Sequence, residues 1–426
     1  MGEDERRVPE GRLSRLARLA AAGARSGAGF VLSRSGDRAA RSAAETLGNL
    51  RGLAAKVGQM ASYVDGVVPE AHREAYEVAM GRLRAAAPTS KPEEIRSLIE
   101  EELRAPLDQL FSEWEDKPLA SASIGQVHRA RVLGSEVEVA VKVQHPGITK
   151  ALEADLANAG IVEQMAGAFG ARRFNSKAML GIVRQRFREE LDYRLEAERL
   201  RYFRDLHAHD DRIHVPAVID ERSSGRVLST ELVRGDDFER ACQADEAQRQ
   251  EHARTLWRFV FRGNLRGGMF NADPHPGNYI FHEQGRISFL DFGCVQPFTE
   301  HHRNNARAMH RAAIEKDEAA FRVAARAMVG TRPGPFEDLL LGYVRSTFET
   351  LWNRPYRITR SFAASLVDGF KEAGQLARKL PDAEITPISE DLFFINRLQF
   401  GFYSVLARLD VEVDYAAEEL SFWGEF

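Results

Sequence analysis

The chain has 426 residues, of which 44% are hydrophobic and 29% are charged, enough for one large domain or two to three ordinary ones. Its formal net charge of −4 gives no indication of a nucleic-acid-binding surface. Only Cys242 and Cys294 are cysteines, so we expect a reduced, intracellular protein without a disulfide framework, with Cys294 as a small packed residue. No stretch approaches the roughly 20 apolar residues of a membrane-spanning helix, and no secretory signal is evident.

The N-terminal segment, residues 1–36, is predicted to be flexible apart from one short helix. Residues 12–22 place leucines and alanines on one helical face and arginines mostly off it. Such a basic amphipathic helix can lie on an anionic membrane surface. Packing on the rest of the protein is the alternative that this pattern alone favours. Residues 23–36 are rich in glycine and serine and indicate a linker or helix break.

A helical extension is predicted over residues 37–112. One helix carries Lys56, Gly58 and Gln59 among apolar residues, and by themselves these look like ordinary solvated positions. Another helix is expected to begin near Pro92, because proline suits the first helical turn. A capping box is expected at its start, formed by Ser90 and Glu93.

Residues 113–233 are predicted to form a kinase-like N-lobe with inserted helices over residues 149–207. The segment 137–143 alternates between apolar and polar residues, as a strand does. It carries Lys142 fifteen residues after Val127. Protein kinases keep that distance between the valine ending their glycine-rich loop and the lysine that binds the nucleotide.

The loop before this strand is predicted to cover a nucleotide. In the kinase register it is rich in alanine and serine, and its positions are Ala120, Ser121, Ala122, Ser123 and Gly125. Glycine lets backbone amides approach phosphates closely, whereas alanine stiffens a loop and adds methyl groups. We therefore expect a loop that binds a nucleotide but covers it differently.

A helix further along is expected to supply a partner for Lys142. A kinase lysine needs a glutamate on a helix, and the candidate acids are Glu190, Asp192 and Glu196. The alternative is a solvated helix with pairs such as Glu190–Arg194.

Two more strands are expected, over residues 215–219 and 226–233. The second ends where a kinase places the hinge whose backbone pairs with adenine, so Glu231 and Val233 are candidate nucleotide contacts. Three nearby histidines form no plausible metal pattern and are interpreted as surface residues: His207, His209 and His214.

The helical C-lobe predicted over residues 234–426 contains the strongest signal. A long helix over residues 245–267 leads into Asp273, which stands five residues before Asn278 and eighteen before Asp291. The apolar runs between Asn278 and Asp291 flank a glycine-containing turn, so they predict a β-hairpin. A hairpin of that length returns the two oxygen-bearing side chains to one point, which suits a hard cation such as Mg²⁺. Asp273 is placed to accept a proton or to orient a nucleophile.

These motifs together resemble the UbiB family, also called the AarF or ADCK family of atypical kinases, over roughly residues 40 to 300. The matching positions are the Lys-x-Gly-Gln signature Lys56–Gln59, the Ala-rich loop Ala120–Ser123, Lys142, the Glu-x-Asp signature Glu190–Asp192, Glu196, the catalytic loop Asp273–Asn278 and the metal motif Asp291–Gly293. Asn271 departs from the pattern, since many members carry histidine there.

The resemblance implies a capped active site. In such proteins the helices bearing Lys56, Gly58 and Gln59 fold over the nucleotide, so these residues are reinterpreted as part of the cap, together with Glu190 and Asp192. The resemblance also implies ATP binding, Mg²⁺ dependence and ATPase activity tied to isoprenoid-quinone or related lipid metabolism. Some bacterial members carry hydrophobic C-terminal spans that this sequence lacks.

The resemblance also implies roles for the remaining positions. Lys142 would hold the inner phosphates, steadied by Glu196. Asn278 and Asp291 would bind Mg²⁺, and Asp273 would orient the attacking group. The predicted fold is α+β: a bilobal protein-kinase-like fold with a small β-containing N-lobe, a mostly helical C-lobe and an N-terminal helical extension capping the active site.

The predicted function is Mg²⁺-dependent ATP hydrolysis, or phosphate transfer to a small molecule or lipid such as a quinone precursor. The alternative is a nucleotide-gated lipid-binding or chaperone-like pseudokinase with little turnover. A true protein kinase is a third interpretation, disfavoured because no Ala-Pro-Glu motif provides a platform for a peptide. We expect a cytoplasmic protein, with peripheral association at the inner face of the membrane as a hypothesis.

Overall fold

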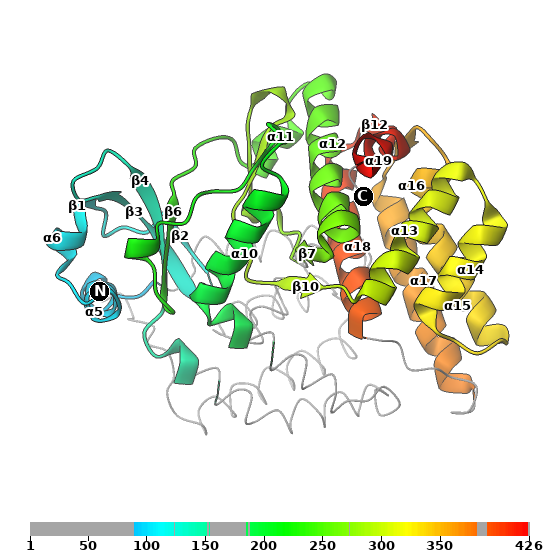
Figure 1. The fold of residues 1–426 in the computed structure, drawn as a ribbon, viewed down its shortest axis with the longest axis horizontal. Coiled ribbons are helices and arrows are strands. Elements are labelled where there is room, and N and C mark those ends of the chain that lie inside the picture. Colours follow the sequence, from blue (N-terminus) through cyan, green and yellow to red (C-terminus); the bar gives the residue numbers. More distant parts are fainter. Residues whose placement is uncertain are drawn as a thin grey trace, which may run out of the picture. The chain divides into compact units, whose positions relative to one another are not determined.

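The computed structural model describes residues 89–150 apart from Ser123, residues 188–380 apart from Ala272, residues 390–424 and the single positions 153 and 185. Within these residues the chain forms two compact units (Figure 1). The first contains the described residues up to Ala197 together with Ala217–Leu232. The second contains Glu198–Pro216 and the described residues from Val233 onwards. The predicted amphipathic helix and most of the predicted inserted helices lie outside the described residues.

The first unit is built on a five-stranded antiparallel sheet. Its strands are β1 (Phe111–Trp114), β2 (Ala120–Ser121), β3 (Gly125–Val132), β4 (Glu138–Gln144) and β6 (Val227–Glu231). The order is β1-β3-β4-β6, with β2 paired to β3. The alternating stretch around Lys142 is therefore a strand, as the sequence predicts, and it lies in the interior of the sheet.

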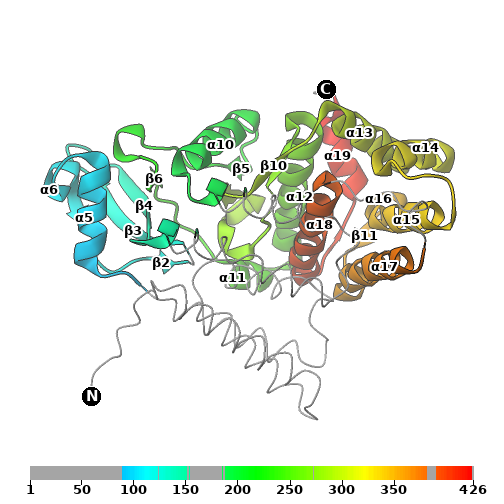
Figure 2. The same ribbon diagram turned by 90° about the horizontal axis from the view of Figure 1, so that it is seen from below.

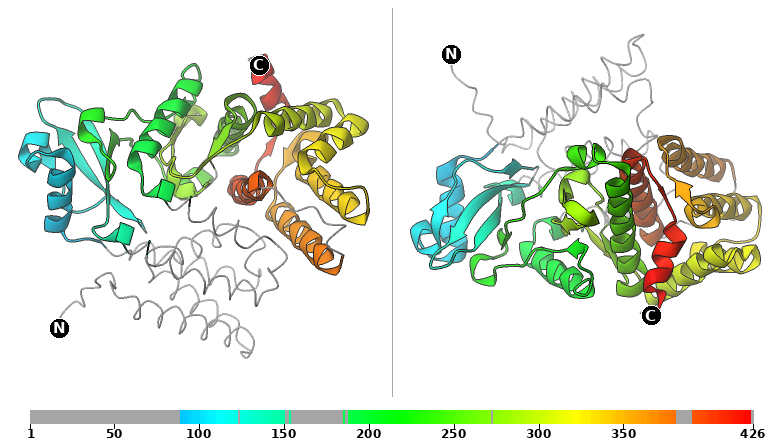
Figure 3. Two further views of the ribbon diagram at one scale, coloured as in Figure 1. Left: turned by 60° about the horizontal axis from the view of Figure 1, so that its bottom comes forward. Right: turned by 90° about the horizontal axis from the view of Figure 1, so that it is seen from above.

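Two helices cover one face of this sheet, α5 (Pro92–Leu103) and α6 (Leu107–Leu110) (Figure 3). Ile95, Leu98 and Ile99 form one stripe of α5 and pack against buried valines of β4. Val139, Val141 and Val143 supply those valines, each fully buried. Burying one such side chain contributes roughly 1.5–3 kcal/mol relative to leaving it exposed. The opposite side chains of β4, among them Lys142, therefore face the other side of the sheet.

The second unit is mostly helical, and the bounds of its elements are as follows. Its helices are α11 (Phe238–Cys242), α12 (Glu246–Arg262), α13 (Glu300–Glu315), α14 (Glu318–Val329), α15 (Pro335–Thr347), α16 (Glu349–Trp352), α17 (Arg360–Lys379), α18 (Glu390–Leu409) and α19 (Tyr415–Trp423). Its short strands are β5 (Ile213–His214), β7 (Met269–Asn271), β8 (Tyr279–Phe281), β9 (Ile287–Phe289), β10 (Val295–Pro297), β11 (Tyr356–Arg357) and β12 (Glu412–Val413). Helix α10 (Tyr193–Leu206) begins in the first unit and ends in the second.

Helices α15, α17 and α18 pack side by side in the second unit (Figure 2). Helix α12 packs against α18 and α19, and its Trp257 is fully buried among their aromatic rings. Within the described part of the chain, no helix combines the length and the apolar character needed to cross a membrane.

An aromatic cluster joins α12 to the predicted hairpin. Strands β8 and β9 pair antiparallel, which confirms the hairpin prediction. The ring of Phe259 on α12 stacks on Phe289 of β9, with 3.6 Å between ring centroids. Phe203 of α10 packs in turn against Phe292, with centroids 4.8 Å apart. The segment around the predicted metal motif is therefore fixed by buried rings.

Three local predictions are wrong. The capping box at α5 does not form: the N-cap residue is Lys91, it makes no side-chain cap, and the Ser90 hydroxyl bonds to His145 instead. The expected strand over residues 215–219 is reduced to one bridge, between Val218 and Thr230. His207 is not a surface residue, because only 2% of it is exposed.

Candidate active site

Lys142 and Glu196 form a tight ion pair within the first unit. The Lys142 ammonium donates to both oxygens of the Glu196 carboxylate, at 2.7 and 2.9 Å. Only 2% of the glutamate side chain is exposed, against 21% of the lysine side chain. The Nζ atom also lies 5.1 Å from the centroid of the Tyr193 ring, within cation–π range. The pair therefore fixes a positive charge that is still partly open to solvent.

Polar contacts hold Glu196 in place by anchoring the start of its helix. Gln144, at the end of β4, donates its side-chain amide to the carbonyl of Leu191 at 2.7 Å. The backbone N–H of Tyr193 donates to the carbonyl of Gly225 at 3.1 Å. The Asp192 carboxylate accepts from the backbone N–H of Arg194 at 3.1 Å and so supports the first turn of α10. The acid of the Glu-x-Asp signature thus supports the helix that carries the lysine's partner.

The Ala-rich loop is ordered by backbone and histidine contacts. Ala120 and Ser121 form β2, which pairs with Gln126 and Val127 of β3. The N–H of Ala122 donates to the carbonyl of Gly125 at 2.8 Å. His145 bonds through Nε2 to the Ala122 carbonyl at 3.0 Å and through Nδ1 to the Ser90 hydroxyl at 2.8 Å. These contacts tie the described residues of the loop to β3 and to His145.

Gly125 cannot be replaced without a rearrangement. A Cβ atom at this position would overlap the carbonyl oxygen of Val143 and would lie 2.8 Å from the Tyr193 hydroxyl. The single glycine kept from the kinase pattern is thus required by the close approach of β3 to β4 and α10.

The predicted adenine-contact residues lie at the end of β6. Glu231 is the last residue of this strand, and its N–H donates to the carbonyl of Ala217 at 2.9 Å. Val233 follows two residues later, where the second unit begins. Their role in nucleotide binding stays a prediction.

The predicted catalytic loop belongs to the second unit and follows β7. The N–H of Asp273 donates to the Asn271 side-chain oxygen at 3.0 Å, which is an Asx turn. The Asn278 side-chain amide donates to the carbonyl of Asp273 at 3.2 Å. Asp273 also adds negative charge beside Tyr279, and burial together with that charge raises the pKa of the Tyr279 hydroxyl.

Asn278 and Asp291 lie at the same end of the β8–β9 hairpin. The N–H of Leu290, next to Asp291, donates to the carbonyl of Asn278 at 2.9 Å. The carboxylate oxygen Oδ1 of Asp291 accepts from the N–H of Gly293 at 2.9 Å. Asn278 and Asp291 are each partly exposed.

This oxygen pair fits Mg²⁺ in the way that nucleotide enzymes bind it. Mg²⁺ takes one or two protein oxygen ligands and completes its shell with phosphates and water. No group of three or more histidine, cysteine or acidic residues forms a cation site among the residues that the structure describes. A dedicated protein cage is therefore not present in that part of the chain, whereas a two-ligand site shared with a nucleotide is compatible with it.

Two residues not predicted from the sequence hold the backbone around these acids. Asn271 was noted only as a departure, yet its side-chain N–H₂ donates to the Asp291 carbonyl at 2.6 Å while its oxygen accepts from Asp273. Arg199, on α10, donates to the carbonyl of Gly293 at 2.9 Å. The Asn-x-Asp pattern was a readable turn signal for Asn271, but no local pattern identifies Arg199, because its partner is 94 residues away in sequence.

The remaining predicted cap residues are placed only in part. Lys56, Gly58, Gln59 and Ser123 lie outside the described residues. Glu190 is helical, lies three residues before the start of α10 and is partly exposed.

Comparison with known proteins places this geometry in a family. Residues 82–324 match the model described as the ABC1 atypical kinase-like domain. Over 378 residues the chain is 28% identical to "Atypical kinase coq-8, mitochondrial" of Caenorhabditis elegans, covering 86% of this chain and 48% of that relative. It is 26% identical to "Atypical kinase COQ8B, mitochondrial" of Danio rerio, covering 95% of this chain and 67% of that relative. The chain therefore spans about half the length of the nematode relative.

A solved structure supports the fold independently. The Rv3197–erythromycin complex from Mycobacterium tuberculosis superposes with a TM-score of 0.59 at 24% identity, covering 96% of each chain. This likeness confirms the predicted α+β kinase-like fold. Since the family model covers more than half of the sequence and the named relatives are atypical kinases, the chain belongs to the ABC1 atypical kinase-like family, which confirms its resemblance to UbiB, AarF and ADCK proteins.

Proposed function

We propose that this chain is an atypical kinase-like enzyme that binds Mg²⁺–ATP and transfers or hydrolyses its terminal phosphate. The observation that carries the proposal is the Lys142–Glu196 ion pair, because a lysine held by a buried glutamate is the arrangement with which kinases bind inner phosphates. The proposed set is completed by Asn278 and Asp291 as Mg²⁺ ligands and by Asp273, which would orient the attacking oxygen. Little covalent chemistry is asked of the protein, so positioning and electrostatics would supply most of the rate.

The physiological acceptor is proposed to be water or a small hydroxyl compound such as a lipid or quinone precursor. The connection from Gly293 to α13 supports this, since only β10 and two further residues lie between residue 294 and Glu300. A protein kinase uses a longer activation segment to hold its peptide substrate. So short a connection leaves little backbone for such a platform.

The first test asks whether the two sets of residues act on the same ATP. Mg²⁺-dependent ATPase activity would be measured for Lys142→Met, Asp291→Asn and the double variant. If both residues act on one nucleotide, the double variant should be little worse than the poorer single variant, because residues that act as a unit are strongly non-additive. Losses that simply multiply would contradict a shared site.

One observation favours the alternative of a nucleotide-gated module with little turnover. The Ala-rich loop is tied down through Ala122, Gly125 and His145, and a stiff loop slows the opening and closing that turnover needs. ATP binding measured by calorimetry, with no ATP consumed in the presence of Mg²⁺, anionic vesicles or a phenolic acceptor, would establish this alternative. Consumption under any of these conditions supports the enzyme.

Peripheral membrane association at the cytoplasmic side is also proposed, on the basis of the amphipathic pattern of residues 12–22. Deleting these residues should lower co-sedimentation with anionic vesicles. Unchanged co-sedimentation would contradict membrane association through residues 12–22.

A further inference from the structure

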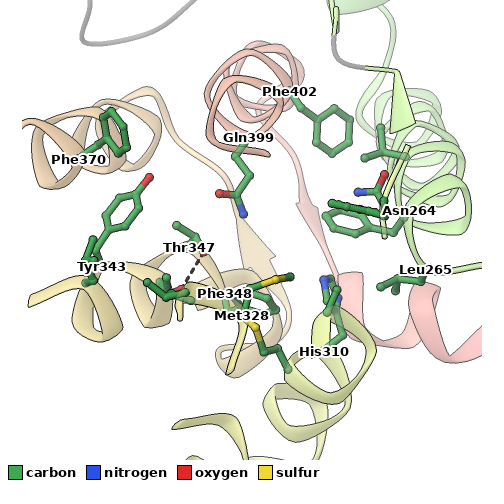
Figure 4. Close-up of a pocket in the computed structure, with 18 residues that line it drawn as sticks. Asn264, Leu265, His310, Met328, Tyr343, Thr347, Phe348, Phe370, Gln399 and Phe402 are labelled. Carbon is green, nitrogen blue, oxygen red and sulfur yellow. Dashed lines mark hydrogen bonds between the residues drawn. The ribbon is translucent and has the colours of Figure 1, made fainter. Parts of the chain in front are cut away.

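Two features of the described residues lie outside the set assigned to nucleotide and metal. In the second unit, apolar side chains such as Met328, Phe348 and Phe402 line a cavity of about 100 Å³ (Figure 4). Selectivity for a small molecule comes from polar groups placed to meet it, so these apolar walls alone specify no ligand. In the first unit, a network of polar side chains ends on the Ala-rich loop. This histidine network consists of Ser90, Gln126, His128 and His145.

Ser90 is the centre of the histidine network, because it bonds in two directions. Its backbone N–H donates to the side-chain oxygen of Gln126 at 2.8 Å, and its hydroxyl lies 2.8 Å from Nδ1 of His145. The amide nitrogen of Gln126 lies 2.8 Å from Nε2 of His128, whose Nδ1 lies 2.8 Å from the carbonyl oxygen of Glu115. Gln126, His128 and His145 are each at most 1% exposed. A buried polar network in which every link is made rigidifies the structure around it.

The carbonyl groups at the two ends of the network fix a proton on each ring. A carbonyl oxygen can only accept, so Nδ1 of His128 must donate to the carbonyl it faces, and Nε2 of His145 must donate to that of Ala122. Burial lowers the pKa of His128, so its ring is neutral at pH 7 and its Nε2 accepts from Gln126. The same orientation of the Gln126 amide turns its oxygen toward the N–H of Ser90. The links are therefore mutually consistent.

Gln126 and His128 lie on the sheet face opposite Lys142. They pair with Val143 and Val141 of β4, and those valines pack on α5. Directly paired residues present their side chains to the same face, whereas Lys142, between the two valines, presents its side chain to the other. Gln126 and His128 therefore do not touch a nucleotide held by Lys142, and the network acts on one only through the backbone of the loop.

His145 holds that backbone at two points. Its own N–H donates to the carbonyl of Ile124 at 2.9 Å, and its ring Nε2 donates to the carbonyl of Ala122 at 3.0 Å. The loop continues from β2, where Ala120 lies in the same cross-strand row as Lys142, with one residue of β3 between them. The backbone that His145 holds is thus anchored in the same sheet as Lys142.

We propose that His145 is a positioning residue for nucleotide binding: its ring holds the Ala-rich loop in the binding conformation before the nucleotide arrives, and Ser90 holds the ring. The inference rests on the proposed function, because it assigns this loop to ATP. A segment that is already ordered loses less conformational entropy on binding, so affinity is gained without a direct contact.

Calorimetric titration of the full chain with ATP and Mg²⁺ tests this role. His145→Ala removes the ring bond and should weaken ATP binding about fivefold to tenfold, the scale of one net hydrogen bond. His145→Gln still offers an amide N–H to Ala122 and an oxygen to the Ser90 hydroxyl, so it should bind ATP within about twofold of the unmodified chain. Unchanged affinity in His145→Ala, or no recovery in His145→Gln, would overturn the proposal.

Ser90→Ala tests the second step, since it keeps the ring but removes the hydroxyl that orients it. ATP binding should weaken about twofold to threefold, less than for loss of the ring itself. The exposed Ser112→Ala, on β1 of the same unit, is the matched control and should bind ATP normally. Equal affinities in these two variants would refute the part assigned to Ser90.

Val139→Ala separates positioning from a loss of stability. Val139 is fully buried in the same unit, and its truncation should lower the free energy of unfolding without touching the histidine network. ATP affinity should stay unchanged in this variant. If Val139→Ala weakens ATP binding as much as His145→Ala does, the effect is one of stability and the proposal fails.

Two measurements without nucleotide distinguish this inference from the proposed function. In nitrogen-15 NMR spectra of the unmodified chain, the His145 ring should carry a proton on Nε2; a proton on Nδ1 alone would overturn the bond to Ala122. Amide hydrogen exchange in the peptide spanning residues 122–125 should be about tenfold faster in His145→Ala, and unchanged exchange would contradict the hold on the loop. Faster exchange in His145→Ala combined with no ATP binding by the unmodified chain would instead refute the proposed function, and the positioning role with it.

Discussion

Two buried titratable residues at α10, one in each compact unit, have opposite surroundings. In the first unit Glu196 is 2% exposed and meets the ammonium of Lys142. In the second unit, just past the end of α10, His207 is equally buried, and neither of its ring nitrogens makes a hydrogen bond within the described residues. The rings of Phe203 and Phe259 pack against it instead. Glu196 is thus buried against an opposite charge, whereas His207 is buried among rings that offer it none.

Asp273 and Asp291, the acids of the predicted catalytic loop and metal motif, show a third arrangement. Asp291 accepts a hydrogen bond from the N–H of Gly293, and Asp273 is tied through its own N–H to Asn271. Backbone N–H groups thus help to hold both residues in place. In the proposed function, the first unit would supply the Lys142 ammonium to the phosphates, and the second would supply oxygen atoms of Asn278 and Asp291 to Mg²⁺.

The largest effect is expected at the metal motif. Asp291→Asn keeps the size of the side chain and can still accept from Gly293, but it removes the negative charge that would bind Mg²⁺. We expect Mg²⁺-dependent ATP turnover to fall by at least about 100-fold, the usual scale for losing one electrostatic contact to the transition state. Steady-state phosphate release over a range of Mg²⁺ concentrations measures this loss.

Asp211→Asn is the matched control, because Asp211 is an exposed acid of the same unit. Its turnover should equal that of the unmodified chain. Full activity in Asp291→Asn would show that these oxygens do not bind the metal.

The second effect is expected at the ion pair. Glu196→Gln leaves the Lys142 ammonium without its counter-charge, so kcat/KM for ATP should fall about 30-fold, or about 2 kcal/mol. The free energy of unfolding should fall by about 2 kcal/mol, less than for a fully buried broken pair, because Lys142 is partly open to solvent. Phosphate release and urea unfolding provide the two measurements.

Glu198→Gln tests whether the loss of the Lys142–Glu196 pair is responsible for the fall in kcat/KM and in stability. Glu198 is exposed and lies two residues further along α10. This variant should match the unmodified chain in both measurements. Equal losses in the two variants would show that the effect comes from removing any acid from α10, which would contradict a specific role of the Lys142–Glu196 pair.

The third effect is the pH dependence of stability that the buried His207 should cause. Burial, with help from the nearby Arg262, lowers the pKa of His207 to about 3. Between the ordinary pKa of 6.5 and this value the unfolded chain binds a proton that the folded chain does not, so stability falls as the pH falls. From pH 7 to pH 5 this one group should cost about 2 kcal/mol of unfolding free energy.

The measurement is the change in unfolding free energy between pH 7 and pH 5, by urea titration. His207→Phe should reduce this change by about 2 kcal/mol, since phenylalanine cannot take up a proton. The exposed His209→Phe should leave the change as it is. An identical pH dependence in His207→Phe and the unmodified chain would contradict the neutral buried histidine.

Much of the fold and of the candidate site was accessible from the sequence, because its strongest signals are local. The alternation around Lys142 specified a strand, and the apolar runs before Asp291 specified a hairpin. The spacing from Val127 to Lys142 reflects their cross-strand pairing, since the two residues lie directly opposite each other in β3 and β4. Such patterns depend on residues that are close in sequence, so they can be recognised without knowledge of the tertiary structure.

What could not be predicted depends on partners that are distant in sequence. The sequence around Ser90 predicts a helix cap, but the Ser90 hydroxyl bonds instead to His145, which is 55 residues away in sequence. His207 looked like a surface residue because its covering ring, Phe259, is supplied by α12. Polar character alone does not reveal that tertiary packing will bury a residue.

The smallest effect, and the finest test of the contrast, concerns Asn271. Its amide joins the two acidic segments by accepting from the N–H of Asp273 and donating to the carbonyl of Asp291. Asn271→Ala should leave the charges intact but lower kcat/KM about fivefold to tenfold, the scale of one net hydrogen bond. Asn271→His should retain more activity because a ring nitrogen can replace one of these bonds. The exposed Asn304→Ala should have no effect. If Asn271→Ala is fully active, backbone dipoles alone suffice to orient the acids, and the tie between the two segments is dispensable.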